Sequence, residues 1–200
     1  MGVEHLAALS RTLRALEPQV DRIWGWALAL ADVLQAGNRL LAVGNGGSAA
    51  QAQHLTSELV GRYCNDRQPF SAISLHADAS TLTAISNDYG VDAVFARQVL
   101  AHGRRGDVLI ALSTSGHSPN VVTAAEVAIT AGLTVWALTG PCPNPLVTCV
   151  HDAVCIEADT TATIQEAHLV VVHMLCSLLD EIVGCGGGSS PRRPSRPSGD

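Results

Sequence analysis

The sequence contains no lysine, and all 12 of its basic residues are arginine. Catalysis through a lysine Schiff base is therefore excluded, because that chemistry needs a primary amine. A Walker-type phosphate loop is excluded as well, since its lysine is missing. Any phosphate site in this chain has to be built without lysine.

Positive charge is also scarce in total, because the formal net charge is −6. A nucleic-acid surface needs clustered basic side chains. The one basic cluster, formed by Arg192, Arg193 and Arg196, lies close to the C-terminus. We expect no nucleic-acid partner.

Paired cysteine motifs and long apolar runs are absent too. The cysteines show no C-x-x-C spacing, and no secretory signal pattern opens the chain, so we interpret them as free thiols in a reducing cytoplasm. They are Cys64, Cys142, Cys149, Cys155, Cys176 and Cys185. The longest apolar stretches, near residues 24–31 and 169–179, are too short or interrupted for a membrane span of about 20 residues. These features predict a soluble cytoplasmic protein with no membrane partner.

The length and composition fit one domain. The chain has 200 residues, of which 47% are hydrophobic, and an ordinary globular domain has roughly 100–200 residues. After Gly184 the sequence becomes CGGGSSPRRPSRPSGD, a composition too poor in apolar residues to order itself. We predict a single domain over residues 1–184 and a disordered tail over 185–200.

Strands alternate with helices along that domain. Apolar residues recur at helical steps over residues 3–35, with a break at Pro18, which predicts two N-terminal helices that also pack against a partner subunit. Apolar runs predict strands at 40–43, 70–75, 107–112, 134–138 and 150–156. Helices are predicted up to residue 60 and at 80–86, 91–101, 119–131 and 163–183. This alternation predicts a parallel α/β sheet over residues 38–184, covered on both faces, with ligands at the carboxyl ends of its strands.

A strand, a glycine turn and a helix follow one another in LLAVGNGGSAAQAQHLTSELVGRY, residues 40–63. Glycines let the backbone approach a ligand, and the N–H groups of the following helix attract anions. On that helix His54 and Glu58 are four residues apart and share one face. The segment predicts an anion site beside an acid/base or metal-binding pair, with a surface ion pair as the alternative.

A second turn, at residues 113–118, carries three serine hydroxyls and one threonine hydroxyl. Pro119 then occupies a favoured first helical position, with Ser118 as the N-cap. Neutral donors at a helix N-terminus suit a phosphate monoester. Residues 44–49 also satisfy G-x-G-x-x-A, so a dinucleotide site is the alternative interpretation. However, the next predicted strand does not end in the acidic residue that this motif requires, and Asp78 lies beyond the end of that strand.

Polar residues interrupt the apolar C-terminal helix at His168 and His173, and Gln165 and Glu166 lie at its start. At 100° per residue, Glu166 and His173 lie about 20° apart around the helix, whereas Gln165 and His173 lie about 80° apart. Periodicity therefore favours Glu166 as the partner of His173. A structural core histidine is the alternative for either histidine.

Four segments, NGGSAAQAQHLTSELVGRY, LTAISNDYG, GDVLIALSTSGHSPNV and TIQEAHLVVVHMLC, occur in this order and spacing. Together they resemble the phosphoheptose isomerases (sedoheptulose 7-phosphate isomerases) of the sugar isomerase (SIS) domain superfamily, over about residues 40–182. The resemblance implies a flavodoxin-like, three-layer αβα sandwich with a parallel five-stranded sheet. It also implies a homotetramer with active sites between subunits.

The resemblance assigns roles to individual residues and implies one Zn²⁺ per subunit. The implied zinc ligands are His54, Glu58, Gln165 and His173. The implied substrate-binding residues are Asn45, Gly46, Gly47, Glu58, Asn87, Asp88, Ser113, Thr114, Ser115, Ser118 and Gln165. Asn87 and Asp88 fall in a predicted turn, 87–90. The resemblance thus selects Gln165 over Glu166, against the preference from helical periodicity.

The implied reaction is the aldose–ketose isomerisation of sedoheptulose 7-phosphate to D-glycero-D-manno-heptose 7-phosphate through an enediolate. Glu58 is the expected base and His173 the expected acid, assisted by zinc. Two alternatives remain: a non-catalytic SIS protein that binds a sugar phosphate or a replication-initiator partner, and an isomerase of another sugar phosphate. The chain departs from the family pattern at His117, at Thr163 and in the loop 140–145, and these positions bear on the choice of sugar.

Overall fold

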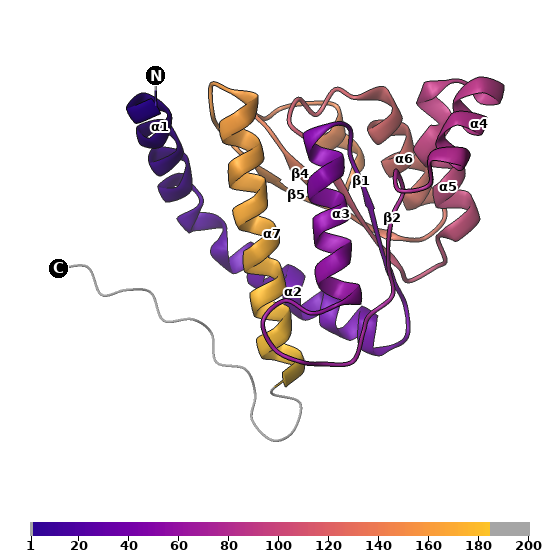
Figure 1. The fold of residues 1–200 in the computed structure, drawn as a ribbon, viewed down its shortest axis with the longest axis horizontal. Coiled ribbons are helices and arrows are strands. Elements are labelled where there is room, and N and C mark those ends of the chain that lie inside the picture. The colour runs from indigo at the N-terminus through magenta and orange to yellow at the C-terminus, as the bar shows by residue number, and fades with distance from the viewer. Residues whose placement is uncertain (1, 185–200) are drawn as a thin grey trace.

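The computed structural model describes residues 2–184, which form a parallel five-stranded sheet between two layers of helices (Figure 1). The strands are β1 (Leu40–Val43), β2 (Ala72–Ser74), β3 (Val108–Ser113), β4 (Thr134–Thr139) and β5 (Asp152–Cys155). Their order in the sheet is β2-β1-β3-β4-β5, which is the flavodoxin-like order. The predicted fold class is confirmed, and all five predicted strands are present.

The chain order reverses between β1 and β3, because β2 lies on one side of β1 while β3, β4 and β5 follow on the other. In doubly wound sheets the carboxyl ends of the strands at such a reversal form a crevice. Both polar turns of the sequence analysis follow these two strands, at residues 44–47 and 113–118. The topology therefore brings the two turns to one edge of the sheet.

Alternating side chains of the strands face two separate cores. Leu40 and Ala42 of β1 pack into a cluster with α2 (Val20–Gln35), α3 (Gly47–Val60) and α7 (Thr161–Gly184). Leu41 and Val43 pack into the opposite cluster, with α5 (Val94–His102) and α6 (Pro119–Thr130). Because side chains alternate along a strand, a strand covered on both faces reads as the continuous apolar run seen in the sequence.

The N-terminal region forms two helices, as predicted, with a short 3-10 turn at Glu17–Gln19 between them. Helix α1 (Gly2–Ala15) lies at the edge of the molecule beside α7 (Figure 1). Helix α2 is anchored on the sheet by an aromatic pair, because Trp26 stacks on Trp136 of β4 with ring centroids 5.0 Å apart. The indole N–H of Trp26 also donates to Asp152 Oδ2 at 2.8 Å.

The predicted turn at residues 87–90 is wrong. Helix α4 (Ala79–Tyr89) continues through Asn87 and Asp88 and ends at Gly90, whose φ is +87°. Asp78 starts the helix by accepting hydrogen bonds from the N–H groups of Ser80 and Thr81. Asn87 and Asp88 therefore lie in the last turn of a helix rather than in a loop.

The prediction that every cysteine is a free thiol is wrong as well. Cys142 and Cys155 form a disulfide, with their Cα atoms 6.1 Å apart. Thr139 and Cys155 are register partners in neighbouring parallel strands, so the loop that leaves β4 reaches the end of β5 within three residues. Cys64, Cys149 and Cys176 are free, and Cys185 lies outside the described residues, as does the predicted tail.

Helix α7 is longer than the sequence suggested. By length and composition alone it could cross a membrane, and among residues 2–184 it is the one helix that could. The expectation that every apolar stretch is too short or interrupted for a membrane span is therefore corrected for this helix. Its side chains at Ile164, Val171 and Leu175 are nevertheless buried against α2 and α3 and the sheet. In this fold α7 is a core helix.

Candidate active site

The glycine turn after β1 is held in a conformation that needs glycine. Gly46 has φ +54°, a region that residues with a side chain rarely adopt. A Cβ on Gly44 would lie 2.7 Å from the backbone carbon of Ser48. Helix α3 begins directly after this turn, at Gly47, so its first N–H groups face the carboxyl edge of the sheet.

Gly47 makes room for Gln165, the residue at the start of α7 that the resemblance selected. A Cβ on Gly47 would lie 2.5 Å from Nε2 and 2.6 Å from Oε1 of Gln165. The side chain of Gln51 donates to the backbone carbonyl of Gln165 at 2.5 Å. The amide of Gln165 is therefore packed against the glycine turn, about 10 Å along α3 from His54 at 1.5 Å per residue.

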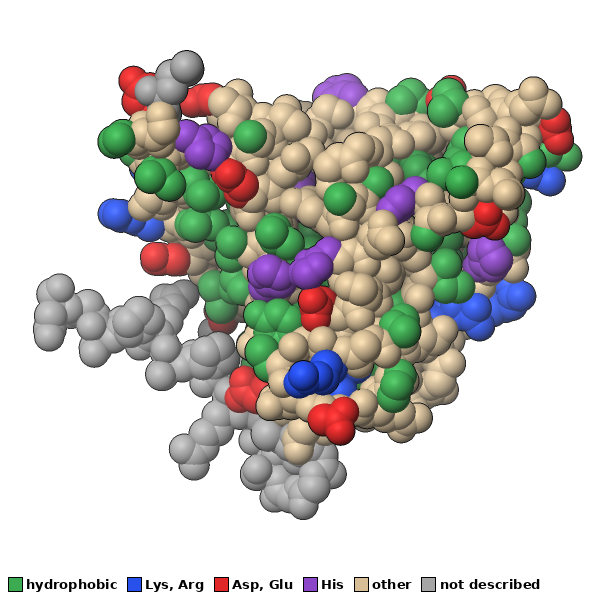
Figure 2. All heavy atoms as spheres, viewed as in Figure 1, with side chains coloured by type: hydrophobic (Ala, Val, Ile, Leu, Met, Phe, Trp, Pro, Cys, Tyr) green, Lys and Arg blue, Asp and Glu red, His purple; other side chains and the backbone are tan. Residues whose placement is uncertain are grey.

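His54, Glu58 and His173 form a cluster where α3 and α7 run side by side. The Nε2 atoms of His54 and His173 are 2.9 Å apart, and Nε2 of His54 is 3.4 Å from Oε1 of Glu58. Figure 2 shows histidine and acidic side chains gathered in the middle of this face, over these two helices. The ring of Tyr63 lies 5.7 Å from that of His173. Residues 119 apart in sequence thus converge on one point.

The donor types of this cluster fit zinc, which takes imidazole nitrogen and carboxylate oxygen in tetrahedral sites. Ligand atoms at 2.0–2.1 Å from a tetrahedral ion lie about 3.3 Å from each other. The His54–Glu58 spacing of 3.4 Å matches, and the two Nε2 atoms at 2.9 Å would separate slightly. Among residues 2–184, no three His, Cys, Asp or Glu side chains are already arranged to hold a metal. The structure brings three of the four predicted ligands together and places Gln165 at the glycine turn.

The serine turn after β3 is ordered by its own hydroxyls. Ser113 Oγ accepts from the N–H of Gly116 at 3.1 Å and lies 3.3 Å from Ser118 Oγ. Ser115 Oγ accepts from the N–H of His117 at 3.1 Å. Helix α6 begins at Pro119 with Ser118 at the N-cap, although the Ser118 side chain makes no capping hydrogen bond. That hydroxyl lies at the N-terminus of α6, an end that attracts anions, and the N–H groups of Val121 and Val122 already donate to the Ser118 carbonyl at 3.1 and 3.0 Å.

Asn120 links the two turns, and the sequence analysis did not identify it. Its side-chain amide and that of Asn45 donate to each other, at 2.8 and 3.0 Å. Asn120 is buried in the first turn of α6. The signal that could have pointed to it is an asparagine directly after a helix-opening proline, at the end of the serine turn. The pair fixes the glycine turn relative to the serine turn.

A cavity of about 610 Å³ opens beside this amide pair. Its lining includes Asn45, Gly46, His76, Asn87 and Asn120. Burial lowers the pKa of His76, which favours the neutral ring as a hydrogen-bond partner. Asn87 donates to the carboxylate of Asp88 at 2.8 Å. The cavity therefore joins the glycine turn to the end of α4.

Two residues weighed in the sequence analysis lie elsewhere. Glu166, favoured by periodicity as the partner of His173, instead lies 2.9 Å from Nε2 of His5 in α1, so that preference is wrong. His168 is fully buried and donates from Nε2 to the carbonyl of Thr139 at 3.1 Å. Burial lowers the pKa of His168 to about 4. It is a neutral core residue, as the alternative reading proposed.

The flavodoxin-like fold, with the glycine and serine turns at the carboxyl edge of its sheet, defines a SIS domain protein. The family model described as SIS domain matches residues 4–140. The phosphoheptose isomerase of Streptomyces coelicolor is 60% identical over 178 residues, which cover 89% of this chain and 77% of that protein. The phosphoheptose isomerase of Shewanella sediminis is 47% identical over 176 residues, which cover 86% of this chain and 89% of that protein.

A solved phosphoheptose isomerase from Neisseria gonorrhoeae superimposes with a TM-score of 0.79 at 37% identity, over 89% of this chain and 94% of that one. The enzyme from Francisella tularensis gives a TM-score of 0.81 at 37% identity, over 88% and 93% of the two chains. The chain belongs to the phosphoheptose isomerase family of SIS domain proteins. It is an isomerase.

Proposed function

We propose that this chain converts sedoheptulose 7-phosphate to D-glycero-D-manno-heptose 7-phosphate. The observation that carries the proposal is the cluster of His54, Glu58 and His173 beside the glycine turn. A protein that only binds a sugar phosphate has no need of a carboxylate and two imidazoles in contact. The names of the two curated relatives described above agree with the substrate class.

Isomerisation moves a proton between C1 and C2 of the sugar through an enediolate, so it needs a base near these carbons and an acid near the oxygens. Glu58 is the base: its carboxylate is mostly shielded from solvent, and its Oε1 lies 3.4 Å from Nε2 of His54. His173 is the acid that serves the sugar oxygens, and its Nε2 lies 2.9 Å from that of His54.

The serine turn binds the phosphate through the hydroxyls of Ser113, Thr114, Ser115 and Ser118, next to the positive dipole end of α6. Asn45, Gly46 and Gly47 hold the reacting end of the sugar, with Gln165 against the same turn. Asn87, which lines the cavity, and Asp88, which accepts a hydrogen bond from it, bind the sugar hydroxyls at the end of α4.

Zinc would be held by His54, Glu58 and His173, one ion per subunit. Gln165, the predicted fourth ligand, is packed against the glycine turn and would have to shift to join them. Glu58 would hold zinc and act as the base in turn, because a carboxylate bound to the ion is a poorer base. Once bound, zinc would polarise the carbonyl and hydroxyl oxygens and stabilise negative charge by several kcal/mol. The proton transfers themselves belong to the side chains of the chain.

We also propose a homotetramer. Val3 and Leu6 of α1 are largely exposed, at 81% and 66%, and an apolar helix surface at the edge of the molecule suits contact with another subunit. Size-exclusion chromatography with light scattering tests this assembly, and a monomer at working concentrations would contradict it.

The decisive experiment incubates the purified protein with sedoheptulose 7-phosphate, with and without a chelator. Turnover that the chelator abolishes and zinc restores supports both parts of the proposal. Absence of turnover in either state would remove the proposed reaction, and turnover indifferent to the chelator would remove the zinc. A panel of pentose and amino-sugar phosphates identifies an isomerase of another sugar.

The variant Glu58→Gln tests the base. Its kcat should fall by about 10²–10⁴-fold, the usual contribution of a positioned general base. Binding of inorganic phosphate should persist because the serine turn is unchanged. A fully active variant would take the base role away from Glu58.

A further inference from the structure

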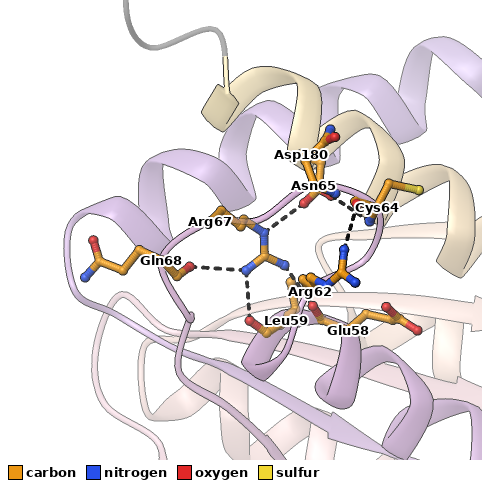
Figure 3. Close-up of polar contacts among 8 residues, drawn as sticks. All are labelled: Glu58, Leu59, Arg62, Cys64, Asn65, Arg67, Gln68 and Asp180. Atoms are coloured by element: carbon orange, nitrogen blue, oxygen red, sulfur yellow. Dashed lines mark hydrogen bonds and ion pairs between the residues drawn. The ribbon is translucent and has the colours of Figure 1, made fainter.

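Below the histidine cluster, a buried ion pair joins the loop after α3 to the last turns of α7 (Figure 3). Nε of Arg67 donates to Oδ1 of Asp180 at 2.8 Å, and the two side chains are only 7% and 2% exposed. The guanidinium also lies 4.9 Å above the ring of Phe70. Isolated charges this deep are costly, so the groups around the pair have to satisfy them.

Arg67 uses its remaining donors on the C-terminal end of α3. One terminal nitrogen donates to the carbonyl of Glu58 at 2.8 Å, and the other donates to the carbonyl of Leu59 at 3.0 Å and to that of Gln68 at 3.2 Å. The last carbonyls of a helix have no partner within the helix. Arg67 supplies that partner, and one of the carbonyls it holds belongs to the proposed base.

Asp180 is equally well satisfied. Its Oδ2 accepts from the N–H groups of Cys64 and Asn65, at 3.1 and 3.2 Å. Burial raises the pKa of Asp180, but the hydrogen bond from Arg67 and those from the two N–H groups outweigh burial, so the pKa lies below its ordinary value. The carboxylate is therefore charged at neutral pH and holds the entire turn that follows α3.

The Arg67–Asp180 ion pair lies near the proposed acid and base on both helices. Asp180 follows His173 by seven residues on α7, which places it about 20° away around the helix and about 10 Å along it. Glu58 lies at the same end of α3 as the carbonyls that Arg67 holds. His54 and His173 join the two helices through a side-chain contact. Arg67 instead joins Asp180 of α7 to backbone carbonyls of α3.

We propose that Arg67 and Asp180 are positioning residues for the isomerase reaction, because their ion pair fixes the turn of α3 that carries Glu58 against the helix that carries His173. The inference rests on the proposed roles of Glu58 and His173. Neither Arg67 nor Asp180 touches the substrate-binding turns in this arrangement. Their loss should therefore change the rate of the chemical step rather than the affinity for the sugar phosphate.

The chain contains a matched control. Asp107 is also buried, pairs with Arg39 at 3.7 Å, and accepts from the N–H groups of Arg39 and Arg104, at 3.0 and 2.9 Å. It lies immediately before β3, at the amino ends of the strands and so at the opposite edge of the sheet from the glycine and serine turns. Removing its charge costs stability in a similar way without reaching the site.

The experiment measures kcat, KM and thermal unfolding for Asp180→Asn, Arg67→Lys and Asp107→Asn. Asp180→Asn should lower kcat by about 10²-fold, as a misplacement of about 1 Å does, and leave KM nearly unchanged. Arg67→Lys should lie between this variant and the wild type, because an ammonium group keeps the charge but cannot span Asp180 and both carbonyls. Asp107→Asn should unfold at a lower temperature yet keep its kcat.

A double variant, Arg67→Met with Asp180→Leu, guards against simple misfolding, because apolar replacement of both partners of a buried pair is often neutral in stability. It should fold and still show the low kcat. A wild-type kcat in this variant, or an equal loss of kcat in Asp107→Asn, overturns the inference.

Failure of the proposed reaction is distinguishable from failure of this inference. If the wild type does not convert sedoheptulose 7-phosphate, the proposed reaction fails, and crystal structures of the wild type and the double variant decide the positioning role. Displacement of the last turn of α3 relative to His173 supports the role. Superimposable helices contradict it.

Discussion

Protonation of His168 should set the stability of this protein in mild acid. The ring is fully buried, its Nε2 donates to Thr139, and its Nδ1 has no hydrogen-bond partner within the described residues. Burial lowers its pKa from 6.5 to about 4. Below pH 6.5 the unfolded chain therefore binds a proton that the folded chain refuses, and stability falls as the pH falls.

The size of the effect follows from these two pKa values. Between 6.5 and about 4 the loss amounts to about 3.4 kcal/mol in total, at 1.36 kcal/mol per pKa unit. At pH 5 about 2 kcal/mol of it is already lost. Above pH 6.5 the contribution is complete, because His168 is neutral in both states.

Urea unfolding at pH 7.5 and pH 5 measures this loss. His168→Gln keeps an amide N–H for the carbonyl of Thr139 but cannot titrate, so it should lose about 2 kcal/mol less than the wild type between the two pH values. The other titrating groups are common to both proteins and cancel in the comparison. His102→Gln, at an exposed position in the last turn of α5, serves as the control. Equal losses in wild type and His168→Gln would refute the reasoning.

Three further outcomes follow from the site and the disulfide. Gly47→Ala should push the amide of Gln165 away and lower kcat/KM at least tenfold. The melting temperature should stay within a few degrees, because only the end of a flexible side chain has to move. A variant with wild-type kcat/KM would show that the position of Gln165 is unimportant. Asn120→Ala should raise KM by about tenfold, since two hydrogen bonds worth about 0.5–1.5 kcal/mol each are lost, and an unchanged KM in steady-state assays would contradict the link between the turns. Reducing the Cys142–Cys155 disulfide should lower the free energy of unfolding by about 3 kcal/mol, and Cys142→Ser should no longer respond to the reductant in urea unfolding.

Local patterns predicted the parts of the fold that depend on near neighbours in sequence. The run Leu40–Val43 gave the first strand with its observed bounds, since a strand buried on both faces is apolar throughout. Pro119 marked the start of α6, and the four-residue spacing of His54 and Glu58 placed both on one side of α3. These signals depend on backbone geometry that a few residues determine.

Contacts between distant residues were beyond that reasoning. Periodicity paired Glu166 with His173 because it treats α7 alone, whereas the position of α1 brings His5 to Glu166. The disulfide depends on the register of β4 and β5, which no cysteine spacing encodes. The predicted helix stopped at residue 86 because Asn87 and Asp88 are typical turn residues. In the structure α4 continues to Tyr89 and ends at Gly90.

Asp180 shows how such contacts could be noticed in a sequence. A carboxylate within the apolar run of α7, seven residues after His173, is costly unless a partner covers it. The sequence offers several arginines, and only the fold selects Arg67. The predicted metal ligands His54, Glu58, Gln165 and His173 stay a prediction, which the chelator experiment addresses.

The stacked pair of Trp26 and Trp136 gives the protein a built-in optical reporter. Both indoles are almost fully buried, at 4% and 5% exposure, and their stacked rings are nearly parallel, with 8° between their planes. Trp26 comes from α2 and Trp136 from β4 of the sheet, so detachment of α2 would separate and hydrate them together. Their emission should shift to longer wavelength at that step, which allows the docking of the N-terminal helices to be followed without an attached dye.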